Sequence, residues 1–174
     1  MAASSAKAAV WTSGAAPCHP EVNFSPENSI TGNAQQLVEQ VLQSAKKSIR
    51  LAGYTFTSPA IVRSLIAAKR RGVDVQVLVD DKGNHGPASV AALNLLAQAA
   101  IPVRTIGVYP IHHDKYIVAD SSTVETGSFN FTKAAAEKNS ENALVLWNCE
   151  SIAKAYLNHW TSRWNQGKNW QLNY

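Results

Sequence analysis

The sequence predicts a single α/β domain in which a mixed β-sheet is flanked by helices. The chain has 174 residues, of which 45% are hydrophobic, enough for one well-buried core and too few for two ordinary domains. Segments with helical spacing of apolar residues alternate with short runs rich in Val, Ile and Leu. This alternation is typical of α/β proteins, in which helices cover the faces of a sheet.

The first half of the domain is predicted to alternate helix and strand. We expect helices over residues 37–45, 58–71 and 88–99 and strands over residues 48–56, 73–80 and 102–105. Ser58 and Pro59 supply a helix cap and a first-turn proline, and Gly72 supplies a stop signal. The run VDVQVLVD over residues 73–80 is expected of a central strand covered on both faces.

The second half is predicted to contain more strand. We expect a hairpin of strands over residues 115–119 and 123–127, a polar loop over 133–140, a buried strand over 142–147 and a helix over 151–165. The residues Trp147, Trp160 and Trp164 fall at core spacing, so they and Trp170 are expected to pack in the core or a dimer interface rather than stack on bases.

The N-terminal residues 1–21 are expected to form a flexible segment, either a leader remnant or a tail, outside a catalytic domain over residues 22–174. The segment lacks the apolar run of about 7–15 residues that marks a secretory signal. The two cysteines, Cys18 and Cys149, define neither a disulfide framework nor a zinc knuckle, and their redox state stays open. No stretch approaches the roughly 18–20 apolar residues of a membrane-spanning helix, so stable membrane insertion is not expected.

The charge of the chain suits a polyanionic partner. The formal net charge is +4, from 16 Lys and Arg against 12 Asp and Glu. Many cations fall in one stretch, namely Lys46, Lys47, Arg50, Arg63, Lys69, Arg70, Arg71 and Lys82. Two interpretations of this stretch stay open: a surface that binds a polyanion, and the solvated faces of two helices.

The residues with the clearest chemistry lie between 111 and 131. The pattern H-x-K-x-x-x-x-D, followed by G-S-x-N, is formed by His113, Lys115, Asp120, Ser128 and Asn130. Side chains two apart on a strand share a face, so His113 and Lys115 are expected to point the same way. A nucleophile and a phosphate-binding cation would then lie side by side. The Ser128 hydroxyl and the Asn130 amide could reach the same anion.

This pattern resembles the signature of the phospholipase D superfamily, and Glu141 resembles an acidic residue that follows that signature. The order of elements over residues 22–166 is similar to that of the small bacterial endonuclease of the superfamily. The resemblance implies a phospholipase D-like sandwich. Because the superfamily uses two signatures per active site and this chain has one, it also implies a homodimer with the active site at the twofold interface.

The same resemblance implies a mechanism without metal or other cofactor. One His113 attacks phosphorus and becomes a phosphohistidine, while the other His113 protonates the leaving oxygen and then activates water. Lys115, Asn130 and Ser128 are expected to bind the non-bridging oxygens. Glu141 is expected to hold the distal ring nitrogen of His113, and Asp120 to shape the hairpin.

Other polar residues are possible contributors to the site. Lys82 and His85 follow the Val-rich strand, where open α/β sheets often present ligand contacts, so they are candidates for substrate binding. His112 is expected to point away from His113 and to have no direct role. The remaining histidines, His19 and His159, are expected to be incidental.

A two-metal nuclease is the alternative suggested by four aspartates, Asp80, Asp81, Asp114 and Asp120. Paired metals need several convergent carboxylates, and Asp114 is expected to point away from His113 and Lys115. A metal site is therefore not expected.

We expect cleavage of single- and double-stranded DNA, with RNA left open, because nothing resembles a base-reading helix. Two alternatives are a phospholipase D acting on phosphatidylcholine-type lipids and a non-catalytic module that binds nucleic acid. No loop looks long and apolar enough to enter lipid, which argues against the first, and the complete signature argues against the second. The endonuclease that the chain resembles is exported, so a periplasmic or secreted location is expected.

Overall fold

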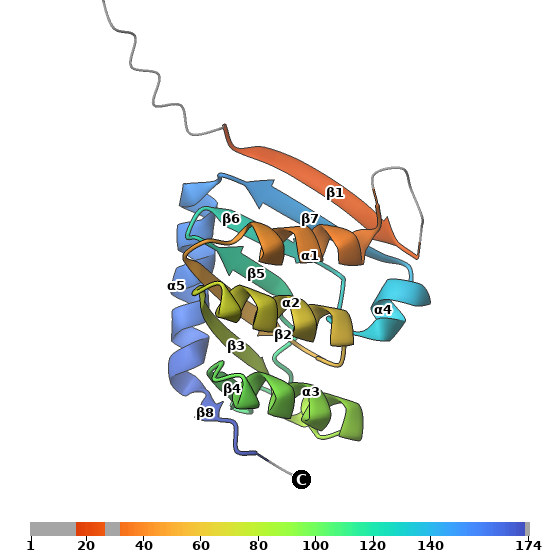
Figure 1. Ribbon diagram of the computed structural model, residues 1–174, viewed down its shortest axis with the longest axis vertical. Coiled ribbons are helices and arrows are strands. Elements are labelled where there is room, and N and C mark those ends of the chain that lie inside the picture. Colours follow the sequence, from red (N-terminus) through yellow and green to blue (C-terminus); the bar gives the residue numbers. More distant parts are fainter. Residues whose placement is uncertain (1–16, 27–31, 173–174) are drawn as a thin grey trace, which may run out of the picture.

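The chain folds around one open eight-stranded sheet, seen in a computed structural model that describes residues 17–26 and 32–172 (Figure 1). The strands are β1 (His19–Ser25), β2 (Ser48–Gly53), β3 (Asp74–Asp80), β4 (Val103–Ile106), β5 (Tyr116–Ala119), β6 (Thr123–Gly127), β7 (Glu141–Trp147) and β8 (Lys168–Asn169). The helices are α1 (Ala34–Ser44), α2 (Pro59–Arg70), α3 (Pro87–Gln98), α4 (Lys133–Glu137) and α5 (Glu150–Gln166), with a 3-10 turn, η1, at Lys82–Asn84.

The sheet is mixed, as predicted. Its strand order is β1-β7-β6-β5-β2-β3-β4-β8. Strands β2, β3 and β4 run parallel to one another, whereas the pairs β2–β5, β5–β6, β6–β7, β1–β7 and β4–β8 are antiparallel. The parallel part is joined by the crossover helices α2 and α3, and the antiparallel part contains the predicted hairpin β5–β6.

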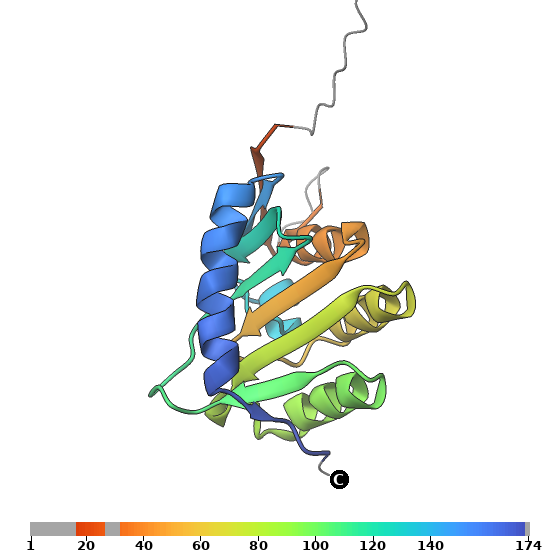
Figure 2. The same cartoon turned by 90° about the vertical axis from the view of Figure 1, so that its left-hand side faces the viewer.

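The two faces of the sheet are covered unequally. Helices α1, α2 and α3 lie on one face, and α5 crosses the other face (Figure 2). The larger core, under the three helices, includes Leu37, Leu65, Val77, Leu93 and Phe131. The smaller core, under α5, includes Tyr116, Val118, Val124 and Trp160. Within the described residues, no helix is both long and apolar enough to cross a membrane.

The helix signals in the sequence act as predicted. The Ser58 hydroxyl caps α2 by accepting a hydrogen bond from the Ile61 backbone N–H, and Pro59 occupies the first turn. In α1, Asn33 and Gln36 form a reciprocal capping box, which was not predicted. The short helix α4 lies in the predicted polar loop and begins after Thr132, whose hydroxyl accepts from the Ala135 N–H.

Trp147, Trp160, Trp164 and Trp170 pack within the described part of the chain. Trp160 is buried, donates a hydrogen bond to the Leu51 carbonyl and stacks on Trp164 with ring centroids 4.7 Å apart. Trp147 and Trp170 donate to side chains of the neighbouring elements β1 and α3, respectively. The expectation of packing rather than exposed stacking surfaces is confirmed for these four residues.

The folded domain begins before the predicted boundary at residue 22. Strand β1 starts at His19 and pairs antiparallel with β7, so residues 19–21 belong to the sheet. A disulfide joins Cys18 to Cys149, at the start of α5. The strand escaped prediction because its register depends on β7, which lies far along the sequence, and because Pro20 is tolerated at a sheet edge. Residues 1–16 of the expected flexible segment lie outside the described residues.

Candidate active site

The segment that carries His113 and Lys115 enters β5 from an irregular loop. Residues 113–115 precede the strand, which begins at Tyr116. The prediction that His113 and Lys115 point the same way used the two-residue repeat of a strand, and that repeat does not apply to this loop. The two side chains nevertheless meet at one aromatic ring. The His113 ring lies 4.9 Å from that of Tyr54, between centroids, and the Lys115 Nζ lies 5.6 Å from the same ring centroid.

His113 and Lys115 also line one cavity, of about 460 Å³. Its other walls come from β6, through Thr126 and Gly127, and from α5, through Ala155, Tyr156 and His159. The Lys115 side chain is buried, and its Nζ donates a hydrogen bond to the His113 carbonyl at 3.0 Å. Burial lowers the pKa of Lys115, although the nearby carboxylates of Glu141 and Asp114 favour its charged form. An anion in the cavity would favour that charged form further.

The backbone that carries the Tyr54 ring is held by a buried amide. Asn84, at the end of η1, is fully buried and donates to the Tyr54 carbonyl at 2.6 Å and to the Asp80 carbonyl at 2.7 Å. Its Oδ1 accepts from the Phe56 N–H at 2.9 Å. These bonds explain why the predicted strand over residues 48–56 ends at Gly53. Neither Tyr54 nor Asn84 was predicted as a site residue, because neither belongs to the signature pattern.

Ser128 and Glu141 form a second polar group at the ends of β6 and β7. The Ser128 hydroxyl donates to Glu141 Oε2 at 2.6 Å and accepts from the Asn142 N–H at 3.1 Å. Glu141 Oε1 accepts from Asn139 Nδ2 at 3.0 Å. Both Glu141 oxygens therefore bind these partners, and not the His113 ring as the resemblance implied. The Glu141 carboxylate also favours the charged form of Lys115, and so opposes the lowering of the Lys115 pKa by burial.

The backbone around Gly127 requires glycine. A Cβ at this position would lie 2.2 Å from the Asn142 carbonyl oxygen, because β6 and β7 approach closely where the Ser128 loop begins. Beyond this point the Phe131 carbonyl accepts hydrogen bonds from the N–H groups of Thr57 and Ser58. The G-S-x-N segment is thereby attached to the end of the loop that starts at Tyr54.

Asn130 lies between these anchored residues. Its Oδ1 is buried and has no hydrogen-bond partner among the described residues. A buried carbonyl oxygen without a partner is costly and therefore uncommon in native proteins. An unpartnered Oδ1 of this kind is expected where a ligand or another chain supplies the missing hydrogen-bond donor.

Asp120 lies at the opposite end of β5 from Lys115 and does not join the group around His113. Its carboxylate accepts hydrogen bonds from the backbone N–H groups of Lys46, Lys47 and Ser48, at 2.9, 2.7 and 2.9 Å. Partial burial alone would raise the pKa of Asp120, but these three donors lower it below its usual value. The Asp120 carboxylate thus connects the turn before β2 to the β5–β6 hairpin.

The two proposed substrate contacts, Lys82 and His85, are exposed and do not line the cavity. His85 Nε2 lies 3.6 Å from Asp81 Oδ2. The cations Arg63, Lys69 and Arg70 lie on α2, on the face of the sheet opposite to α5. Arg71 donates to the carbonyls that end α1. Of the two interpretations of the basic stretch, the structure favours the solvated faces of helices for these residues.

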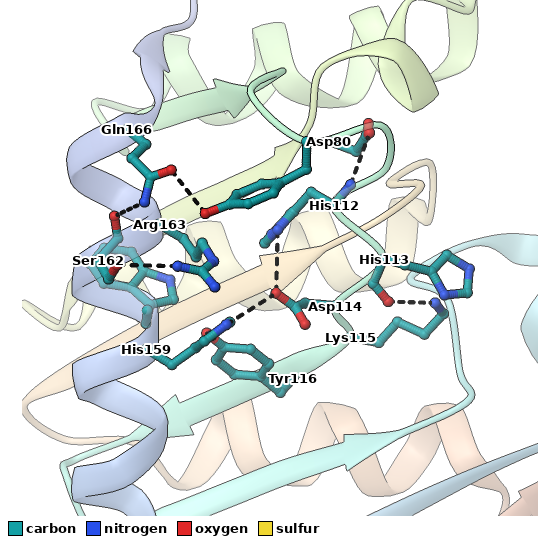
Figure 3. A network of polar contacts seen from close by, with 12 residues as sticks. Asp80, His112, His113, Asp114, Lys115, Tyr116, His159, Ser162, Arg163 and Gln166 are labelled. Atoms are coloured by element: carbon teal, nitrogen blue, oxygen red, sulfur yellow. Dashed lines mark hydrogen bonds and ion pairs between the residues drawn. The ribbon is translucent and has the colours of Figure 1, made fainter.

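A second polar cluster lies between the His113 segment and α5 (Figure 3). His112 points away from His113, as expected, and its Nδ1 lies 3.2 Å from Asp114 Oδ2. His159, expected to be incidental, lines the cavity. Its Nδ1 lies 2.9 Å from the Tyr116 hydroxyl and its Nε2 lies 3.9 Å from Asp114 Oδ2.

Burial shifts the pKa values of two residues in this cluster. It lowers the pKa of His112, although Asp114 and Asp80 favour the charged form of that imidazole, and it raises the pKa of Tyr116.

The i, i+4 spacing of His159 and Arg163 on α5 was a sequence signal that could have pointed to this helix. Within the described part of the chain, no three His, Cys, Asp or Glu side chains are grouped as a metal ion would require.

Comparisons with known proteins identify the family of the chain. A family model described as the PLD-like domain of cardiolipin synthase matches residues 38–164. A phospholipase D of Rickettsia bellii is 35% identical over 140 residues, which cover 80% of this chain and 66% of the relative. A mitochondrial cardiolipin hydrolase of Xenopus laevis is 34% identical over 131 residues, 75% of this chain and 60% of the relative. The chain thus spans less than two thirds of the length of these curated relatives.

Two solved structures of similar size share the fold. The phospholipase D family member Nuc from Salmonella typhimurium is 51% identical, with a TM-score of 0.85, covering 89% of this chain and 99% of that one. NucT from Helicobacter pylori has a TM-score of 0.78 and covers 88% of this chain and 100% of that one. Its identity of 22% makes it a likeness of fold alone.

Proposed function

Because the chain belongs to the phospholipase D-like family, we propose that it is a metal-independent phosphodiesterase that cuts nucleic acid through a phosphohistidine intermediate. The observation that carries the proposal is the meeting of His113 and Lys115 on the ring of Tyr54, at the wall of one cavity. This arrangement pairs a nucleophile with a cation that can bind the oxygens of a phosphodiester.

The reaction consists of two displacements at phosphorus. A ring nitrogen of His113 forms a bond to phosphorus, the bond to the leaving ribose oxygen breaks, and His113 of the partner subunit gives that oxygen its proton. The same partner histidine then removes a proton from water, whose oxygen displaces His113 and releases the phosphate product. The Lys115 ammonium and the N–H groups of the Asn130 amide bind the non-bridging oxygens, and the Ser128 hydroxyl joins them when it exchanges its hydrogen bond to Glu141 for one to the phosphate.

The mechanism requires a homodimer, since the chain supplies one histidine of the signature. Exposed apolar side chains on the α5 side of the molecule support such an interface. On β1, Asn23 and Ser25 are buried toward α1 and α4, so Val22 and Phe24, exposed by 48% and 49%, face the α5 side. Ile111, exposed by 54%, lies two residues from His113. Burial of Ile111 in such an interface would bring two His113 segments together.

Nucleic acid is the substrate that the similarities favour. The likeness to Nuc combines higher identity with nearly complete coverage of a chain of the same size, and the sequence resembles the small endonuclease of the family. A second candidate, hydrolysis of a phospholipid diester, is favoured by the names of the curated relatives, phospholipase D and mitochondrial cardiolipin hydrolase. The reacting group, a phosphodiester, is the same in both.

We also propose a periplasmic or secreted location. The Cys18–Cys149 disulfide supports this location, because disulfides form and persist in oxidising compartments.

The test is cleavage of plasmid DNA by the purified chain in excess EDTA, with His113→Asn as the inactive variant and His19→Asn as the matched control. His19 is an exposed histidine on β1, outside the cavity. We expect nicking that persists in EDTA, is lost in His113→Asn and is retained in His19→Asn. Cleavage abolished by EDTA would overturn the mechanism. Hydrolysis of phosphatidylcholine vesicles without cleavage of DNA would replace the nuclease by the lipid candidate.

A further inference from the structure

We propose that a second subsite beside His113 binds the nucleotide next to the scissile phosphodiester, with Arg163 contacting its phosphate and Tyr109 stacking on its base. This inference rests on the proposed nuclease function and adds the residues that recognise a polynucleotide.

The subsite is a smaller cavity, of about 170 Å³, that continues the first one. The two cavities share His113, Asp114 and His159, so a chain of nucleotides could pass from one to the other along the reacting histidine. Tyr109 and Arg163 line the smaller cavity only. A group bound there would lie directly beside the phosphodiester held at His113.

Arg163 is a cation whose donors are mostly available. Among the described residues, its guanidinium donates one hydrogen bond, from Nη1 to the neighbouring Ser162 hydroxyl at 3.1 Å, and it forms no ion pair with any described carboxylate. Figure 3 shows its side chain extending from α5 toward the cluster around His112. A planar guanidinium with available N–H groups is suited to bind phosphate oxygens in pairs.

Tyr109 is fixed before any ligand binds. Its hydroxyl donates to Gln166 Oε1 at 2.9 Å, and Gln166 Nε2 donates to the Ser162 carbonyl at 2.9 Å. The Arg163 Cζ lies 4.9 Å from the centroid of the Tyr109 ring, as in a cation–π pair. A fixed aromatic ring paired with an arginine is a common platform for bases of single-stranded nucleic acid.

The carboxylate at the boundary of the two cavities has two imidazoles beside it. Asp114 faces His112 on one side and His159 on the other, at 3.2 and 3.9 Å. The carboxylate is thus directed toward two imidazoles rather than presented alone to an incoming phosphate. His159 is in turn held by the Tyr116 hydroxyl.

A polynucleotide fits this pair of side chains better than a phospholipid does. A nucleic acid strand presents a further phosphate and a base beside every phosphodiester. A phosphatidylcholine presents one phosphate and a cardiolipin two, but both carry apolar tails and neither carries a base. An arginine and an aromatic ring next to the reacting histidine therefore match the repeating unit of a nucleic acid.

The experiment compares Arg163→Gln with Arg70→Gln, an exposed arginine on the opposite helical layer, and includes Arg163→Lys and Tyr109→Leu. Binding of a fluorescent single-stranded oligonucleotide is measured against salt in the His113→Asn background. Cleavage of the oligonucleotide and of bis(p-nitrophenyl) phosphate is measured with His113 present. Thermal unfolding verifies that each variant is folded.

We expect Arg163→Gln to weaken oligonucleotide binding and to reduce the slope of log K against log salt by about 0.7 for each phosphate that the variant no longer neutralises. Arg163→Lys should keep much of that slope because it keeps the charge. Tyr109→Leu should weaken binding without changing the slope. Both Arg163→Gln and Tyr109→Leu should lower kcat/KM far more for cleavage of the oligonucleotide than for cleavage of the small diester. Arg70→Gln should have the kcat/KM of the wild type for both substrates.

Two results would overturn the subsite. One is an equal decrease of kcat/KM for the oligonucleotide and the small diester, and the other is unchanged oligonucleotide binding in Arg163→Gln and Tyr109→Leu. Hydrolysis of cardiolipin vesicles is measured in parallel. A loss of that hydrolysis in Arg163→Gln and Tyr109→Leu, with cleavage of the oligonucleotide unchanged, would assign the cavity to lipid and would overturn the subsite as well. The binding arm is independent of turnover. Absence of all hydrolysis in the wild type would count against the proposed function, while the salt titration would still decide the subsite.

Discussion

The imidazole of His113 packs against the ring of Tyr54, with centroids 4.9 Å apart and ring planes tilted by 56°. The same tyrosine lies under the Lys115 ammonium, and a buried amide, Asn84, holds its backbone. The two signature side chains, His113 and Lys115, therefore both pack against a residue outside the signature.

Replacing Tyr54 with Leu should lower kcat by about tenfold or more, because the imidazole and the ammonium lose the surface that orients them. Tyr54→Phe keeps the ring and should keep most of the activity. The pH profile separates positioning from folding: Tyr54→Leu should alter the pH dependence of kcat, while the thermal midpoint falls only slightly. Equal activity of the Leu and Phe variants would remove the positioning role.

Asp120→Asn should destabilise the fold without altering the pH optimum of the reaction, because the carboxylate binds backbone N–H groups far from His113. The folded state lowers the pKa of Asp120, so its stabilisation is present above the unfolded pKa and is lost as the pH falls through the folded value. In urea unfolding, the wild type should have a larger free energy of unfolding than Asp120→Asn at pH 7, and this difference should shrink toward pH 3. A constant advantage, or a loss of kcat at full stability, would contradict this role.

Glu125→Gln should stabilise the protein at neutral pH. Glu125 is almost fully buried on β6, one of its carboxylate oxygens has no described partner, and burial raises its pKa to about 8. A carboxyl whose pKa is raised on folding contributes stability below its unfolded pKa, and that stability is lost as the pH rises from about 4.5 to about 8. The difference corresponds to about 3 kcal/mol at pH 7.

Urea unfolding at pH 5 and pH 8 tests this. The free energy of unfolding of Glu125→Gln should increase relative to that of the wild type as the pH rises from 5 to 8. Glu39→Gln, a change on α1 at a partly exposed position, serves as the control and should leave the pH dependence unchanged. Parallel curves for Glu125→Gln and the wild type would show that Glu125 is ionised in the folded protein.

Reduction of the Cys18–Cys149 disulfide should lower the free energy of unfolding by about 2–5 kcal/mol, because the bond closes a long loop that ties β1 to α5. The comparison is urea unfolding with and without dithiothreitol, with the Cys18→Ala, Cys149→Ala double variant as a control that should not respond to the reductant. Hydrogen exchange should become faster in β1 first. An unchanged unfolding midpoint on reduction would show that strand pairing alone holds β1.

Local patterns in the sequence were sufficient for most elements of the fold. Ser58 and Pro59 started α2, the Val-rich run became β3, and the hairpin β5–β6 formed where alternation and a turn predicted it. The spacing of the signature residues also identified the family. These features are encoded by residues near one another in the chain, so periodicity and capping reveal them directly.

Tertiary structure decided which distant residues meet. Strand β1, the Cys18–Cys149 bond, the Tyr54–His113 contact and the cavity of Tyr109 and Arg163 each join segments far apart in the sequence. The irregular path of residues 113–115 likewise depends on packing rather than on strand repeat. The sequence by itself therefore determined most of the helices and strands and the signature residues, His113 and Lys115 among them. Only the folded sheet, which brings loop ends and α5 against one another, determined their neighbours.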